Sequence, residues 1–215
     1  MTDYSRYLAA KKSVDDRALN RAVLADLRPL LAQGPCRVLE IGAGLGTMVA
    51  RLLEWQVVSA GEYTLLDVDP RLLRDSRTWL CGWAAARGVP AEPLADGVRL
   101  GDLRVRLLEA ELGSYLGSGS GDPADLLVAH AFLDLVDVPA VLPGLLRLLV
   151  PGGAYWFTVV FDGESVFQPD HPDDDDVLGA YHRSMDGRVR YGRSAGERRA
   201  GRHLFGHLRA AGAPA

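Results

Sequence analysis

Two hydrophobic patterns divide this chain. Between residues 4 and 31, apolar residues such as Leu8, Leu19 and Leu27 recur at helical spacing among charged positions, which predicts two helices. From residue 38 to residue 161, short apolar runs alternate with longer amphipathic stretches. Short apolar runs are typical of buried parallel strands. Their alternation with helical stretches predicts a doubly wound α/β fold, with a mostly parallel sheet and helices on both faces.

The strands and helices of this fold follow from the same pattern. Strands are expected at residues 38–41, 63–67, 103–108, 125–130 and 154–161. Helices are expected at residues 47–55, 70–87, 138–150 and 194–212. Residues 98–100 alternate like a further strand and would pair with residues 103–108 around a Gly101-Asp102 turn.

A glycine-rich turn follows the first expected strand. Gly42, Gly44 and Gly46 lack a Cβ atom, so the backbone can turn sharply there and approach a ligand closely. The helix expected behind them would direct its first N–H groups at that ligand. The spacing G-x-G-x-G differs from the G-x-G-x-x-G of dinucleotide-binding loops. A nucleotide-binding loop is the favoured interpretation, and a tight structural turn is the alternative.

An acid ends the second expected strand. Asp67 lies roughly twenty residues beyond the last glycine, where an acid binds ribose hydroxyls in nucleotide-binding folds. A carboxylate suits this position because it can accept hydrogen bonds from both hydroxyls. Asp69, directly before Pro70, is expected instead to cap the next helix.

The sequence Val-Leu-Glu-Ile-Gly-Ala-Gly-Leu-Gly-Thr at residues 38–47, with its acid Glu40, resembles the first motif of the class I S-adenosylmethionine-dependent methyltransferases. Two later segments resemble the same family: Asp-Leu-Leu-Val-Ala-His at residues 125–130, and Leu-Val-Pro-Gly-Gly at residues 149–153 before an aromatic strand. The matches lie in the family's order over residues 37–161. The resemblance implies a Rossmann-like methyltransferase fold and methyl transfer from S-adenosyl-L-methionine.

The resemblance also implies a set of site residues. The cofactor-binding residues would be Glu40, Gly42, Ala43, Gly44, Gly46, Asp67, Val68, Glu111, Leu112 and His130. An acid after the third strand would accept a hydrogen bond from the adenine amino group, with Glu111 as the first choice and Glu109 as the second. His130 would face cofactor and substrate, and it is the first choice for a catalytic base, ahead of His171 and His182. A structural histidine at position 130 is an equal alternative.

The chain divides into an N-terminal segment and one larger domain. Residues 1–34 are expected as a helical segment, either a solvated helix pair or a lid over the cofactor. Residues 35–215 are expected as the S-adenosylmethionine-binding α/β domain, in which residues 162–193 would cover the substrate. The antiparallel strands that the family commonly adds at its end are missing before Ala215. The chain would therefore be truncated there, or another segment or chain would cover that sheet edge.

The composition of the chain limits which partners and ligands are expected. The chain has 215 residues, 48% hydrophobic and 24% charged, with a net charge of −4, which suits a soluble domain and disfavours nucleic acid. Its two cysteines have neither metal nor disulfide spacing. The acidic run at residues 173–176 is expected as a solvated helix start, so no metal site is expected. No apolar run of membrane length and no signal peptide are seen, and a cytoplasmic protein with a small-molecule substrate is expected. A homo-oligomer stays open.

Three other functions stay open. A non-catalytic or partner-dependent methyltransferase-like subunit would share the fold, and the missing strands favour it. A NAD(P)-dependent oxidoreductase would share the loop and the ribose acid but requires the other glycine spacing. The third is a nucleic-acid or protein methyltransferase, and the acidic composition disfavours nucleic acid as the substrate. The chain also has Ala-His-Ala-Phe after the fourth strand, where base methylases carry an Asn-Pro-Pro-aromatic or Asp-Pro-Pro-aromatic signature.

Overall fold

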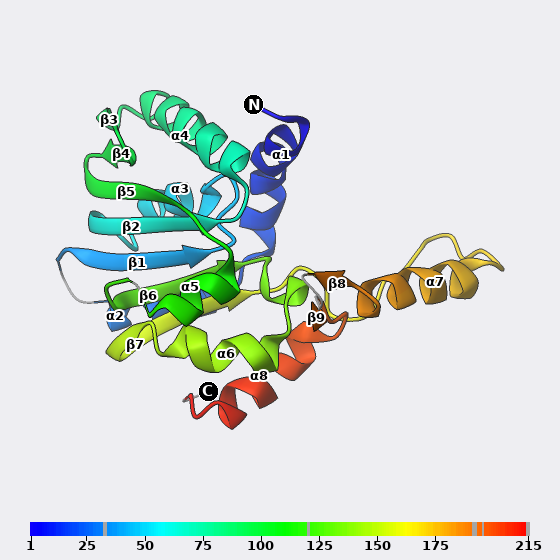
Figure 1. Ribbon diagram of the computed structural model, residues 1–215. Helices are drawn as coiled ribbons and strands as arrows, with labels where there is room; N and C mark the ends of the chain where they lie inside the picture. Colours follow the sequence, from blue (N-terminus) through cyan, green and yellow to red (C-terminus); the bar gives the residue numbers. More distant parts are fainter. Residues whose placement is uncertain (32–33, 120, 191–192, 195, 214–215) are drawn as a thin grey trace. The chain divides into compact units, whose positions relative to one another are not determined.

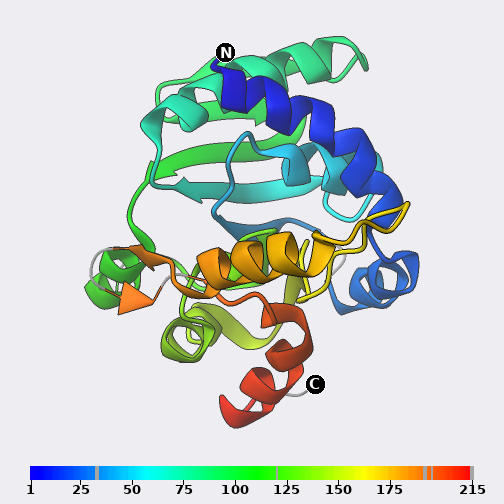
Figure 2. The same ribbon diagram turned by 90° about the vertical axis from the view of Figure 1, so that its right-hand side faces the viewer.

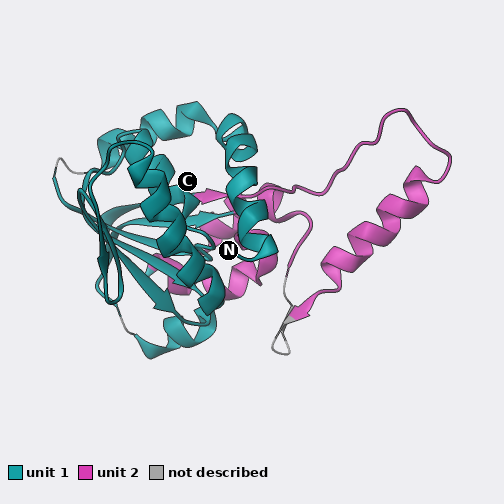
Figure 3. Cartoon of the chain, turned by 90° about the horizontal axis from the view of Figure 1, so that it is seen from above, with its two compact units in different colours: residues 1–130, 147–156 teal, residues 131–146, 157–215 magenta. Residues whose placement is uncertain are grey.

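A computed structural model describes residues 1–31, 34–119, 121–190, 193–194 and 196–213 (Figure 1). The expectation about a chain end at Ala215 lies outside these residues. The chain forms two compact units, drawn in different colours in Figure 3. Unit 1 comprises residues 1–130 and 147–156, and unit 2 comprises residues 131–146 and 157–215.

Unit 1 is built on a seven-stranded sheet with the strand order β3-β4-β5-β2-β1-β6-β7. Its strands are β1 (Cys36–Ile41), β2 (Ala60–Asp67), β3 (Ala91–Leu94), β4 (Gly97–Leu100), β5 (Asp102–Glu109), β6 (Ala124–His130) and β7 (Leu149–Thr158), whose last two residues belong to unit 2. Strand β1 pairs in parallel with β2 and β6, and β2 pairs in parallel with β5. Strands β3, β4 and β5 pair in antiparallel fashion. The expected mostly parallel α/β sheet is confirmed, as is the hairpin around Gly101-Asp102.

The two edges of the sheet are where the strand predictions were wrong. Strand β3 was not expected because Pro90 and Pro93 interrupt its sequence. Strand β7 begins at Leu149 and ends at Thr158, whereas a strand over residues 154–161 was expected after a Pro-Gly-Gly turn. Both strands lie at the ends of the strand order, where one side of the backbone forms no ladder hydrogen bonds. An edge strand tolerates proline for that reason.

Four of the helices described in unit 1 follow the sequence pattern closely. The helix at Leu112–Ser118 was not expected, because the Gly/Ser-rich sequence of residues 113–123 predicts a flexible loop. The helices are α1 (Asp3–Ala18), α2 (Arg21–Leu30), α3 (Thr47–Glu54), α4 (Pro70–Ala85) and α5 (Leu112–Ser118). The two expected N-terminal helices are confirmed, and each begins at a polar cap. The Thr2 hydroxyl accepts the Ser5 N–H, and the Asn20 side chain accepts the Ala22 N–H. Caps of this kind satisfy N–H groups that the first helical turn leaves without intrahelical partners.

The core of unit 1 lies where α2, α3 and α4 pack against one face of the sheet, elements that Figure 2 draws from the side. Its buried residues include Met48, Val49 and Leu52 of α3, Leu73, Leu80 and Trp83 of α4, and Val38, Leu65, Val105 and Val128 of the central strands. Each large apolar side chain buried in this way contributes roughly 1.5–3 kcal/mol of transfer free energy. On the opposite face, Glu62, Thr64 and Arg106 of β2 and β5 line a cavity of about 190 Å³ together with Tyr115 of α5.

Unit 2 contains the remaining elements. They are the 3-10 helix η1 (Leu133–Leu135), α6 (Val138–Leu146), α7 (Asp174–Asp186), β8 (Val189–Arg190), β9 (Arg193–Ser194) and α8 (Ala200–Ala210). Helix α6 packs against α8. The acidic run at residues 173–176 begins α7, so the predicted helix start is confirmed. The helix expected from residue 194 begins only at Ala200, because Arg193 and Ser194 pair with β8. Among the described residues, no helix is long and apolar enough to span a membrane.

Candidate cofactor site

The glycine turn between β1 and α3 is tightly closed. Gly42, Gly44 and Gly46 have φ angles of 64°, 56° and 74°, in the left-handed region that favours glycine. The Gly46 N–H donates to the Ala43 carbonyl at 2.9 Å, and the Ala43 N–H donates to the Leu66 carbonyl of β2 at 3.0 Å. The turn is therefore fastened to the end of β2 as well as to its own chain.

Asp67 lies directly against this turn. Its Oδ2 accepts the Gly44 N–H at 2.7 Å, and its Oδ1 accepts the Asp69 N–H at 2.9 Å. The side chain of a carboxylate offers about four acceptor positions, so these two bonds leave others for a ligand. The structure thus brings together the glycine turn and the acid that the sequence selected, although Asp67 is only 8% exposed.

Val68 and Asp69, the two residues that follow Asp67, have different surroundings. Val68 is 49% exposed beside the turn. The Asp69 carboxylate accepts the Arg71 N–H at 2.8 Å and forms an ion pair with the Arg71 guanidinium at 3.0 Å. The predicted role of Asp69 as the cap of α4 is confirmed.

Glu40 faces the core of unit 1. Its Oε2 accepts the Tyr63 hydroxyl hydrogen at 2.8 Å, and the residue is 2% exposed. Burial raises the pKa of Glu40 to about 8, although the hydrogen bond from Tyr63 lowers it. A carboxyl with this pKa is largely protonated at neutral pH. The predicted role of Glu40 in holding the cofactor stays a prediction.

Glu109 and Glu111, at and just after the end of β5, lie in different environments. Glu111 caps α5, because its Oε2 accepts the Ser114 N–H at 2.8 Å, and Leu112 beside it is buried. Glu109 is exposed at the end of β5, and the strand register places it opposite Asp67. It also lines a cavity of about 480 Å³ next to α4. Proximity to Asp67 favours Glu109, the second choice from the sequence, over Glu111.

His130 ends β6 and is shielded from solvent. Its Nε2 lies 3.3 Å from Asp15 Oδ2, and 11% of its side chain is exposed. Burial, followed by the positive charge of Arg51, lowers the pKa of His130 to about 4. The imidazole is therefore neutral at pH 7. It can accept a proton, but a base is most effective when its pKa lies near the working pH.

The other two histidines considered from the sequence lie in unit 2. His171 is exposed, and its Nδ1 accepts the Asp173 N–H at 3.2 Å. His182 Nδ1 lies 3.0 Å from an Arg198 guanidinium nitrogen. Their roles as bases stay predictions.

A buried arginine that the sequence did not single out fastens α1 to α3. The Arg51 side chain is fully buried, and its Nε donates to Asp16 Oδ1 at 2.5 Å. Its guanidinium also donates to the Thr47 hydroxyl at 3.0 Å and to the Lys12 carbonyl at 3.2 Å. The sequence shows the Lys-to-Asp spacing of four residues within α1, but nothing in it points to a partner on α3.

Helix α1 lies over the glycine turn. A Cβ atom at Gly44 would lie 3.2 Å from Leu8 Cδ1. The start of α1 is held to α4, since the Thr2 N–H and the Ser5 hydroxyl donate to Asp75 Oδ2 at 2.8 and 2.5 Å. The glycine conformations and the acid fit an adenosyl cofactor. A ligand lying against Gly44 would also contact or displace Leu8.

Comparison with known proteins gives fold neighbours. No protein-family model and no curated protein match the sequence. Among solved structures, mitomycin 7-O-methyltransferase MmcR matches with a TM-score of 0.52 at 18% identity, over 97% of this chain and 53% of that chain. Mycolic acid cyclopropane synthase CmaA1, solved with SAH and CTAB, matches with a TM-score of 0.53 at 15% identity, over 92% of this chain and 64% of that chain.

A third structure is a complex between the Trm112 methyltransferase activator of Haloferax volcanii and a candidate methyltransferase. It matches with a TM-score of 0.55 at 17% identity, over 98% of this chain and 74% of that chain. The chain spans about half the length of several of its structural neighbours, among them the mitomycin enzyme at 53%. Sequence identities this low show similarity of the fold alone. The chain has the Rossmann-like α/β fold of these methyltransferase structures.

Proposed function

We propose that this chain is an enzyme that binds S-adenosyl-L-methionine and transfers its methyl group to a small-molecule acceptor. The observation that carries the proposal is the 2.7 Å hydrogen bond from the Gly44 N–H to Asp67 Oδ2. This bond joins the two features that a nucleoside ligand requires. One is a turn whose backbone the ligand can approach closely, and the other is an acid that binds the ribose hydroxyls. The fold shared with the methyltransferase structures supports the same ligand.

In this proposal each part of the site has one task. The glycine turn lets the ligand approach the backbone, and the remaining acceptor positions of Asp67 bind the ribose hydroxyls. Glu109, with Glu111 as the alternative, accepts the hydrogen bond of the adenine amino group. Leu8 on α1 covers the turn and excludes water. Residues 162–193 remain our prediction for the segment that covers the acceptor.

The bound cofactor would supply a methyl group already activated on a positively charged sulfur. The residues of the chain would therefore act mainly by aligning the acceptor and excluding water. His130 is neutral at pH 7 and could take a proton from the acceptor. Its pKa of about 4 makes it a weak base, which favours acceptors that lose their proton readily or carry none at the reacting atom.

Calorimetry with S-adenosylmethionine, S-adenosylhomocysteine and NAD tests the proposal. The wild type should bind the first two and not NAD. Asp67→Ala and Gly44→Val should each weaken binding about tenfold or more, because one removes charged hydrogen bonds and the other fills the turn. Equal binding by both variants and the wild type would contradict the proposed site.

Two matched controls separate the ligand from the fold. Asp69→Ala removes a carboxylate two positions from Asp67 that caps a helix. Gly88→Val introduces the same strain as Gly44→Val, since Gly88 has a φ of 68°, yet no atom lies within 4 Å of its Cβ position. Both controls should bind S-adenosylhomocysteine like the wild type.

A second function, a non-catalytic or partner-dependent subunit, is favoured by a specific contact. Leu8 lies against Gly44, where the cofactor would approach the backbone. In the Haloferax volcanii complex, a candidate methyltransferase fold is accompanied by an activator. If Leu8→Ala binds S-adenosylhomocysteine and the wild type does not, the isolated chain is held in a closed state. Absence of turnover with pooled small-molecule acceptors would then favour this second function.

A further inference from the structure

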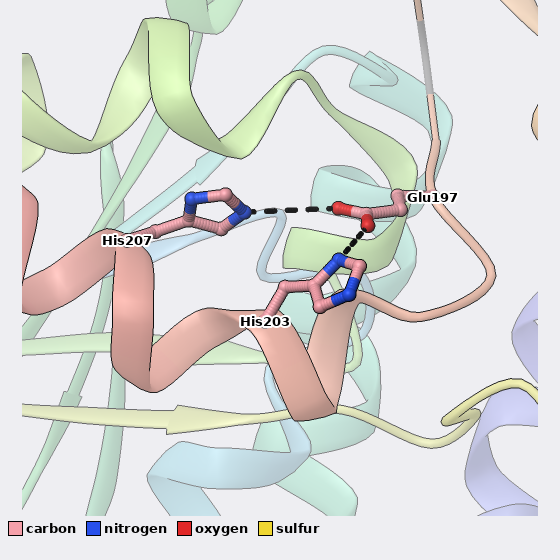
Figure 4. Close-up of side chains that lie close together, drawn as sticks. All are labelled: Glu197, His203 and His207. Carbon is pink, nitrogen blue, oxygen red and sulfur yellow. Dashed lines mark hydrogen bonds and ion pairs between the residues drawn. The ribbon is translucent and has the colours of Figure 1, made fainter.

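Three side chains of unit 2 converge at the start of α8 (Figure 4). They are Glu197, His203 and His207, and one ligand atom of each lies within 4.8 Å of the others. His203 and His207 are four residues apart on α8, so they share one face of the helix one turn apart. Glu197 precedes the helix, and its carboxylate points between the two imidazole rings.

The backbone holds Glu197 in this position. Its N–H donates to the Asp134 carbonyl at 3.3 Å, and its carbonyl accepts the Ala200 N–H at 3.2 Å. One carboxylate oxygen forms an ion pair with His203 Nδ1, and the other lies 3.9 Å from His207 Nε2. The three donors therefore belong to one arrangement whose acid is anchored by its own main chain.

His207 carries the second observation. Its Nε2 is screened from solvent, and it has no hydrogen-bond partner among the described residues. A buried polar nitrogen without a hydrogen bond is uncommon and requires an explanation. This nitrogen faces the carboxylate of Glu197, so an ion between the two would satisfy it.

Two arginines near Glu197 form ion pairs with other acids. Arg198 forms an ion pair with Asp186 at 3.0 Å, and Arg202 forms one with Asp162 at 3.4 Å. Each arginine is therefore directed to its own acid. Among the described residues, the Glu197 carboxylate forms ion pairs with the two imidazoles and with no arginine.

We propose that Glu197, His203 and His207 form a binding site for a divalent transition-metal ion, Zn²⁺ in the first place. Two imidazole nitrogens and one carboxylate oxygen are a ligand set that suits Zn²⁺ and disfavours Mg²⁺ and Ca²⁺, which prefer oxygen. Zn–N and Zn–O bonds of about 2.0–2.2 Å place tetrahedral ligand atoms roughly 3.3 Å apart. The three ligand atoms lie within 4.8 Å of one another, so their side chains would adjust around the ion. The ion would fasten the segment before α8 to the helix.

Metal titration of the full chain without an affinity tag tests this site. A metal-stripped sample is titrated with Zn²⁺ in competition with a chromophoric chelator. The wild type should bind one equivalent, and His207→Ala and the nearly isosteric Glu197→Gln should each weaken binding at least tenfold. His171→Ala is the matched control, because this exposed histidine lies next to the acidic run on α7, and it should leave the affinity unchanged.

Co²⁺ gives a second readout that does not depend on stability. Its absorption should indicate nitrogen and oxygen ligands in the wild type and should be lost in the double variant His203→Ala/His207→Ala. Unchanged Zn²⁺ affinity in that double variant overturns the proposal. So does a thiolate-to-cobalt transition, which would assign the ion to Cys36 or Cys81. Because the cofactor residues lie in unit 1, S-adenosylhomocysteine binding can fail without affecting this result.

Discussion

Two sets of buried polar side chains in unit 1 compensate for the loss of water in opposite ways. The Arg51 cluster consists of Arg51 on α3 with Lys12, Asp15 and Asp16 on α1. The Glu40 pair consists of Glu40 on β1 with Tyr63 on β2. Arg51 is fully buried and meets two carboxylates, whereas Glu40 is equally buried and meets a hydroxyl. Among the described residues, no cation forms an ion pair with Glu40.

The difference shows that the counterion decides the charge of a buried acid. Burial alone would raise the pKa of Asp16, but hydrogen bonds from Arg51 and Lys12 outweigh it and lower the pKa. Glu40 has no such partner, and burial raises its pKa to about 8. At neutral pH the two carboxylates of the Arg51 cluster are therefore ionised, while Glu40 is largely protonated.

The largest effect is expected from Arg51→Met, which keeps the apolar volume but removes the buried cation. Two carboxylates then lose their partner, and the free energy of unfolding should fall by about 4 kcal/mol. Urea unfolding at pH 7 measures this change. Arg37→Met is the control, since Arg37 and Asp125 form an exposed ion pair at 3.9 Å. It should cost less than about 1 kcal/mol, and equal losses would contradict the assigned role of Arg51.

Glu40→Gln tests the protonation of Glu40 through the pH dependence of the free energy of unfolding. The pKa of Glu40 rises from 4.5 to about 8 on folding, so between these values the folded state keeps a proton that the unfolded state releases. The free energy of unfolding of the wild type should therefore fall as pH rises from 4.5 to 8, by an amount on the order of 3 kcal/mol. The glutamine variant, which cannot ionise, should lack this slope in urea unfolding measured across the range.

His130 should titrate in the opposite sense. Its pKa falls from 6.5 to about 4 on folding. Between these pH values the unfolded state binds a proton that the folded state does not bind. Stability should decrease as pH falls from 6.5 to 4, by an amount on the order of 2 kcal/mol. Because the charge of Arg51 lowers this pKa, NMR titration of the imidazole should show a higher pKa in Arg51→Met. A lower or equal value would exclude the coupling.

The smallest effect is expected from Lys12→Met. Lys12 lies at the edge of the Arg51 cluster and forms ion pairs of 2.9 Å with Asp16 and with Glu54 of α3. The loss should be about 1 kcal/mol, because Asp16 keeps Arg51 and solvent reaches both acids. A double-mutant cycle with Glu54→Gln isolates the contact between the helices. A coupling energy near zero would mean that Arg51 alone holds α1 to α3.

Much of unit 1 could be predicted from the sequence because its signals are local. The apolar runs of β1, β2, β5 and β6, the glycine turn and the position of Asp67 depend on neighbours a few residues away. The edge strands β3 and β7 were misjudged because proline is read as a breaker unless the strand's place in the sheet is known. The burial of Glu40 against Tyr63 and the contact of Leu8 with Gly44 join residues far apart in sequence.

The sequence by itself determined the α/β architecture, the tight glycine turn and the acid beside it, since hydrophobic periodicity and glycine conformation act over short distances. Only the tertiary structure decided which polar groups are charged, what covers the turn and which histidines meet Glu197. Burial, counterions and ligand geometry depend on segments that approach one another only after folding. A residue's type alone therefore does not specify its ionisation state or its partner.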